Sequence, residues 1–137
     1  MISFTILGEP ASKANQRRLV KFGDRPALIK SDKARAYEKS ALLQIPAGAR
    51  QNLQGEVRVT LRIYYANQRP DLDESAVLEL LQAKFEKQGG ERVMVRSGVY
   101  LNDRQVREKH VFHGIDRVNP RCEIQVESIE PQRELAA

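Results

Sequence analysis

The chain has few of the residues that cross-link small proteins or bind structural metals. Cys122 is the single cysteine among 137 residues, and tryptophan is absent. One cysteine excludes an intrachain disulfide and a cysteine-based zinc site, which favours a reducing compartment. No stretch approaches the roughly 20 apolar residues that cross a bilayer, and the first residues lack a secretory signal pattern. We therefore expect a cytoplasmic protein with no membrane partner.

The common cofactor and catalytic motifs are also missing from the sequence. It has no phosphate-binding glycine loop, no dinucleotide-binding glycine run, no serine nucleophile elbow and no HExxH pair. His110 and His113 are three residues apart on an expected strand, so they face opposite ways. The sequence therefore predicts no small-molecule cofactor.

The charge balance is basic. The chain carries 23 Lys and Arg against 18 Asp and Glu, a net charge of +5, and its pI is about 9.6. Such a balance favours attraction to a polyanion, above all nucleic acid. The length and the 41% hydrophobic content predict a single domain over residues 1–130, followed by a polar tail over 131–137.

Hydrophobic periodicity predicts a mixture of strands and helices. Alternating apolar residues indicate strands at 2–7, 57–65, 106–113 and 121–129. Helical spacing indicates one helix that begins after Ser31 or Asp32 and another over 73–87, with Val77, Leu80, Leu81 and Phe85 on one stripe. We expect a basic loop at 11–18, a short hairpin within 19–30 and an irregular connection at 88–98 with room for one short strand. The predicted fold class is α+β: a mixed, mainly antiparallel sheet with two principal helices packed on it.

Carboxylates gather where the strand 57–65 leads into the second helix. They are Asp71, Asp73 and Glu74, and Asp103 follows about thirty residues later. Carboxylate oxygens suit a hard cation such as Mg²⁺. Asp73 lies one turn before Val77 and so points inward, where it needs either a cation or a backbone N–H as partner. Asp71 and Glu74 also have the spacing of a capping box, which is the simpler role for either residue.

The order of these pieces resembles the RusA family of Holliday junction resolvases. The resemblance covers most of the chain and rests on four short stretches. These are Gly8-Glu9-Pro10 with the basic residues after it, Pro70-Asp71-Leu72-Asp73, Asn102-Asp103-Arg104-Gln105-Val106, and Lys109. The family consists of small endonucleases that are common in phages and prophages.

This resemblance implies a Mg²⁺-dependent homodimer, with Mn²⁺ as a substitute, that cuts four-way DNA junctions symmetrically. Asp71, Asp73 and Asp103 match the family's metal-binding and catalytic positions. The resemblance and the basic charge together predict phosphate contacts from Lys13, Arg17, Arg18, Arg69, Arg104 and Lys109. RusA-like resolvases act in DNA recombination and repair.

Three positions depart from the family pattern. Glu74 stands where an asparagine is usual, Val77 replaces a lysine that contributes to catalysis, and Asn102 replaces the first aspartate of a pair. Two alternatives therefore stay open. One is a junction-binding protein that no longer cuts, and the other is a structural or interaction domain in which the carboxylates cap a helix or pair with basic side chains.

Overall fold

A computed structural model describes residues 1–12, 17–68, 71 and 73–131 of the chain. Its centre is a four-stranded sheet in the order β1-β8-β4-β7. Neighbouring strands are antiparallel except for β4 and β7, which run parallel. The bounds are β1 Ile2–Leu7, β4 Val57–Tyr65, β7 Val106–Ile115 and β8 Arg121–Ser128. The predicted α+β class with a mixed, mainly antiparallel sheet is confirmed.

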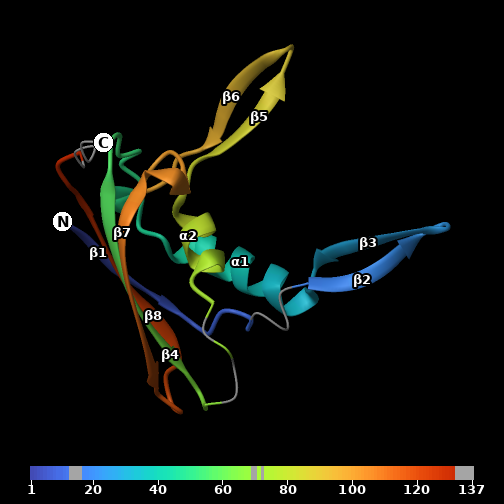
Figure 1. The fold of residues 1–137 in the computed structure, drawn as a ribbon, viewed down its shortest axis with the longest axis horizontal. Helices are drawn as coiled ribbons and strands as arrows, with labels where there is room; N and C mark the ends of the chain where they lie inside the picture. The colour runs from blue at the N-terminus through green and yellow to red at the C-terminus, as the bar shows by residue number, and fades with distance from the viewer. Residues whose placement is uncertain (13–16, 69–70, 72, 132–137) are drawn as a thin grey trace, which may run out of the picture.

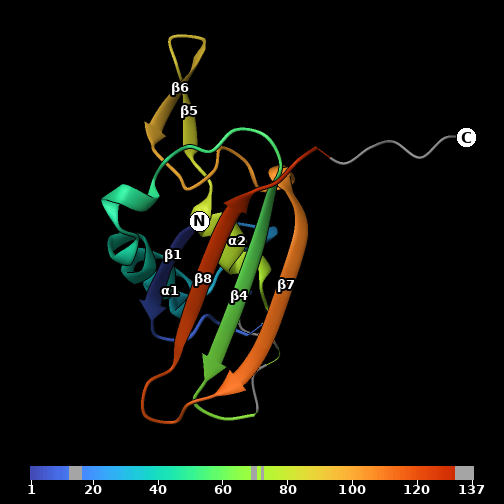
Figure 2. The same ribbon diagram turned by 90° about the vertical axis from the view of Figure 1, so that its left-hand side faces the viewer.

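Strand β4 provides the middle of the core. Its inward side chains are Val57, Val59, Leu61, Ile63 and Tyr65, and all five are fully buried. Burying such a side chain stabilises the fold by about 1.5–3 kcal/mol. Both helices cover this face, whereas the opposite face of the sheet is open (Figure 1, Figure 2).

The first helix begins as the sequence predicts. Helix α1 spans Asp32–Gln44, and Ser31 Oγ caps it by accepting a hydrogen bond from the Ala34 N–H at 3.1 Å. Ala34 and Ala41 are buried. The apolar stripe of α1 therefore faces the core, with its start fixed by the serine.

The second helix is shorter than predicted, so the expected helix over 73–87 is wrong beyond Leu81. Helix α2 spans Ser75–Leu81, and residues 84–96 form a hairpin of β5, Lys84–Gln88, and β6, Glu91–Arg96. The segment after β6 ends α2, because it forms hydrogen bonds with the backbone at the end of the helix. Val99 N–H donates to Leu81 O, and Ala83 N–H donates to Tyr100 O. Gly89 and Gly90 both have positive φ and form the two-residue turn. The one short strand expected within the connection 88–98 is β6.

The hairpin predicted within 19–30 is confirmed but begins earlier. Strands β2, Arg17–Phe22, and β3, Arg25–Lys30, pair antiparallel. Arg17 and Arg18 therefore lie in a strand, and their assignment to a loop is wrong. The pairing of Arg17 with Lys30 extends the ladder to the end of β3. Lys13 lies outside the described residues.

The two hairpins project from the main body on the side that carries the helices (Figure 1). We call them the β2–β3 arm, residues 17–30, and the β5–β6 arm, residues 84–96. The first holds five Lys and Arg against one Asp, and the second holds four against two Glu. The arms together carry a net charge of +6, which exceeds the +5 of the whole chain.

The remaining elements are two short 3-10 helices, η2 at Ala47–Ala49 and η3 at Asp103–Gln105. None of the helices in the described part of the chain is long and apolar enough to cross a membrane.

Gly98 lies where the segment after β6 crosses the end of α2. A β carbon there would meet the Ala83 amide nitrogen and lie 2.6 Å from the Tyr100 carbonyl oxygen. We expect Gly98→Ala to lower the free energy of unfolding by about 3 kcal/mol and the melting temperature by roughly 10 °C. Gly48→Ala is the control, since a β carbon at Gly48 meets nothing within 4 Å. Equal melting temperatures for the two variants would contradict the observed crossing.

Candidate active site at the start of helix α2

Asp73 lies where the chain from β4 enters α2, and it is only 5% exposed. Its Oδ1 accepts hydrogen bonds from the Ser75 hydroxyl at 2.6 Å and from the Ser75 N–H at 3.1 Å. Among the described residues, none donates a hydrogen bond to Oδ2. Of the two partners that the sequence allows, a backbone N–H therefore holds one oxygen of Asp73.

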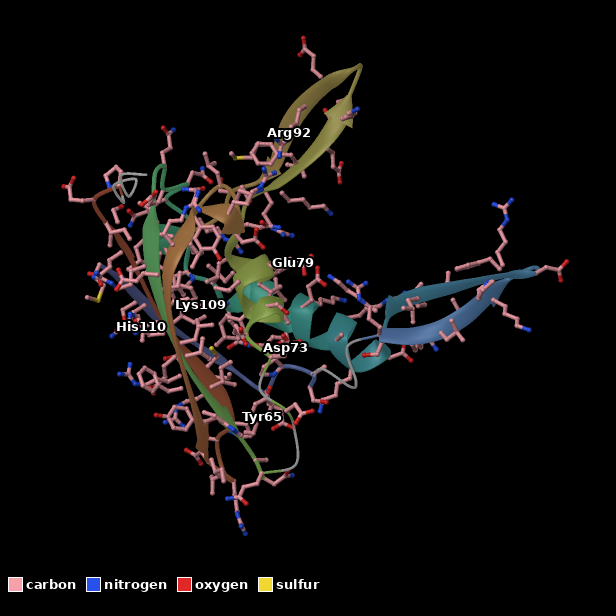
Figure 3. The ribbon with its side chains drawn as sticks, in the orientation of Figure 1. Tyr65, Asp73, Glu79, Arg92, Lys109 and His110 are labelled. Atoms are coloured by element: carbon pink, nitrogen blue, oxygen red, sulfur yellow. The ribbon has the colours of Figure 1, made fainter. Side chains whose placement is uncertain are left out.

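Tyr65 lies beside Asp73 (Figure 3). It was not among the site residues predicted from the sequence. Burial raises the pKa of Tyr65 to about 12, the carboxylates of Asp73 and Glu9 add to the rise, and the Asp73 backbone opposes it. Glu9 is itself held by the Ala66 N–H and by Lys33. A polar residue at the end of the buried stripe of β4 was the signal that could have identified this position.

Lys109 brings a positive charge to the same end of α2. Its Nζ lies 3.3 Å from Glu74 Oε1, and the lysine side chain is 46% exposed. Such a pair contributes only about 0–1 kcal/mol to stability. The pair matters for the position of the lysine, because it holds Lys109 of β7 against Glu74, the residue next to Asp73 (Figure 3).

Asp103 lies near the other end of α2. It is exposed in η3, and its N–H donates to Gln82 Oε1 at 3.1 Å, next to the last turn of the helix. At 1.5 Å per residue, the seven residues of α2 separate the two ends by about 10 Å. The structure therefore brings Asp71 and Asp73 to one end of the helix and leaves Asp103 at the other.

The capping interactions differ from the expected ones. The capping box predicted for Asp71 and Glu74 is wrong, since α2 begins at Ser75 and Glu74 makes no side-chain cap bond. A capping box forms instead between Asn102 and Gln105. The Gln105 amide group also donates to Leu53 O and Gly55 O at 2.8 Å. These bonds fix η3 and explain its position without a metal.

The donor chemistry at the start of α2 fits Mg²⁺ in part. Among residues 1–12, 17–68, 71 and 73–131, no group of three or more His, Cys, Asp or Glu is arranged to hold a metal ion. Mg²⁺ is, however, often held by one or two carboxylates together with substrate phosphates and waters. Asp71, which is exposed, and Asp73 are the pair that suits this mode.

The predicted DNA contacts are spread over several elements. Arg17 and Arg18 lie on the β2–β3 arm, and Arg104 is exposed in η3. Arg18 lies 3.5 Å from Asp32. Arg69 is outside the described residues. None of the described positions is buried, and Lys109, like Arg18, has a carboxylate partner.

The open face of the sheet is neutralised within the chain. Arg58 donates to Glu108 and Glu127 at 2.9 Å, and hydrogen bonds from Arg58 and His110 lower the pKa of Glu108. Arg121 lies over the Tyr64 ring and bonds Asp116 at 2.6 Å. This pairing favours an ordinary solvent-exposed face over a phosphate-binding one.

Comparison of the chain with models of known protein families and with curated proteins found no match. The resemblance to RusA resolvases therefore rests on the residues that carry it.

The Asp73–Ser75 contact can be measured with a double-mutant cycle. We expect Ser75→Ala to cost about 1 kcal/mol and Asp73→Ala about 1–2 kcal/mol, because Asp73 holds the start of α2. The double variant should cost about 1 kcal/mol less than the sum, since the hydroxyl bond is lost only once. Urea unfolding gives these values. Ser3→Ala, on the exposed face of β1, should add to Asp73→Ala without coupling. Additive costs for Ser75 would show that the contact is absent in solution.

Proposed function

We propose that this chain is a Mg²⁺-dependent endonuclease that cuts branched DNA, with four-way junctions as the substrate. The charge distribution carries the proposal. Both arms carry a net positive charge, and they leave the body on the side of the sheet where Asp73 lies at the start of α2 (Figure 3). A polyanion drawn to the arms would pass close to a buried carboxylate. Binding of this kind weakens steeply as salt is added.

Asp73 and Asp71 would hold the cation together with phosphate oxygens of the DNA. Mg²⁺ bound there supplies a water of lowered pKa and neutralises charge on the phosphate. Ser75 keeps Asp73 in one orientation through Oδ1, and Oδ2 would bind the cation. Asp103 belongs to the proposed catalytic set through the family resemblance, and it would have to approach from the far end of α2.

Lys109 is our candidate for the charge that the family's helix lysine provides. Val77 holds that sequence position here and is fully buried against the sheet, so a lysine at 77 would point into the core. Lys109 approaches the start of α2 from β7 and is held there by Glu74. Glu74, which stands where the family has an asparagine, is the residue that pairs with Lys109.

Two symmetric cuts require two active sites. A homodimer supplies them, because its two-fold axis can coincide with that of the junction. Resolution of junctions in this way would place the protein in DNA recombination and repair.

The second candidate function is junction binding without cleavage. The position of Asp103 favours it, since only two of the three family carboxylates share one end of α2. The basic arms would serve this function equally well.

A cleavage assay on a synthetic mobile four-way junction tests the proposal and the role of Lys109. We expect paired nicks in Mg²⁺ or Mn²⁺ and little cutting of linear duplex. Lys109→Met should slow cutting about 100-fold, the scale of losing one charge-stabilising group. Lys39→Met, an exposed lysine on α1, should cut at the wild-type rate.

Two results would contradict these expectations. Tight junction binding with no cutting in either metal would support the binding function instead. Equal cutting by the Lys109 and Lys39 variants would leave the proposed nuclease in place and remove Lys109 from its site.

A further inference from the structure

A cavity of about 580 Å³ lies between α1, α2 and the β5–β6 arm. Its volume is within the range of small-molecule sites. The floor consists of small or apolar side chains from the two helices and the start of the arm: Ala34, Ala76, Leu80 and Ala83. Leu80 also belongs to the core cluster that holds Val77 and Leu81, so the cavity adjoins the inward stripe of the helix.

One wall of the cavity is both aromatic and basic. Phe85, Lys87 and Arg92 of the arm line it, and the Arg92 guanidinium lies 4.2 Å from the centre of the Phe85 ring. Lys87 stands directly opposite Arg92, and Lys84 directly opposite Arg96. Like charges in such pairs destabilise a hairpin. Two such pairs on one short arm favour an anion as the partner of this wall.

Arg96 adds a further positive charge to the lining of the same cavity. Its Nε is buried and has no acceptor in the described part of the chain. The Arg96 charge is also felt by Arg50, whose pKa is lowered by burial first and by Arg96 second. Positive charge is therefore in local excess.

The carboxylates around the cavity do not cancel this excess. Glu38 is paired with Lys30 at 2.6 Å, and Glu86 lies 3.6 Å from Lys84. Glu79 also lines the cavity and is exposed to solvent (Figure 3). The lining holds five Lys and Arg against three Glu, so a net charge of +2 remains to meet a ligand's negative charge.

We propose that this cavity binds one unstacked nucleotide of a DNA strand, with its base against Phe85 and the apolar floor and its phosphate on Lys87, Arg92 and Arg96. Stacking on an aromatic side chain beside a basic groove is how proteins hold single strands without reading their sequence. The inference rests on the proposed DNA substrate and needs no cleavage. At a branch point it would capture a nucleotide that has left its helix.

Binding of a labelled short oligothymidylate, followed by fluorescence anisotropy in EDTA, tests this site. We expect Phe85→Leu and Arg92→Met each to weaken binding about tenfold, the scale of one lost base stack. Arg117→Met, an exposed arginine in the turn between β7 and β8, should bind as the wild type does. Lys87→Met, on the exposed arm surface, should repeat the loss in a variant whose folding is not at risk.

The outcomes separate this inference from the proposed function. Equal binding by the wild type and all three arm variants would overturn the nucleotide site and leave cleavage at Asp73 untouched, because the assay holds no divalent cation.

Thymidine monophosphate is the competitor. If it displaces the strand at equal concentration, the cavity takes a free nucleotide and the proposed strand contact is wrong. If the wild type binds neither single strands nor junctions, the proposed function fails as well.

Discussion

The parallel pairing of β4 with β7 is the constraint on which the rest of the structure depends. Parallel neighbours cannot be joined by a tight turn, so the chain between them must return along the whole length of the sheet. Residues 66–105 make that return, and they contain α2, the β5–β6 arm and η3. Asp73 stands at the beginning of this connection and Asp103 at its end. The separation of the two carboxylates is thus a consequence of the topology.

The same topology divides the charge of the molecule. On the open face of the sheet, arginines such as Arg58 and Arg121 are matched by carboxylates on neighbouring strands. On the helical side, the two arms carry the excess and set cations such as Lys87 and Arg92 directly opposite each other. A hairpin of two strands is marginal in water by itself. The like charges on the arms lower the stability of the hairpins, whereas they favour the binding of a polyanion.

Much of the fold could be predicted from local patterns, and the rest depends on contacts between distant segments. The strand at 57–65 and the start of the first helix depend on residues adjacent in sequence, so both predictions are confirmed. The end of α2 is decided by Tyr100, which binds the backbone of Ala83 from far along the chain, and no local pattern contains that bond. The residue types of the site were identifiable. The distance between Asp73 and Asp103 could not be predicted from the sequence, because the position of η3 is fixed by the capping box between Asn102 and Gln105.

Cleavage of a mobile four-way junction by the wild type and by Asp73→Asn tests the central claim most directly. The variant keeps an oxygen that can accept from Ser75 but loses the charge that would hold Mg²⁺. We predict paired symmetric nicks from the wild type, none from the variant, and equal junction binding by both in EDTA. Cutting by Asp73→Asn at the wild-type rate would contradict a catalytic centre at the start of α2. Failure of the wild type to cut in either Mg²⁺ or Mn²⁺ would contradict the nuclease itself.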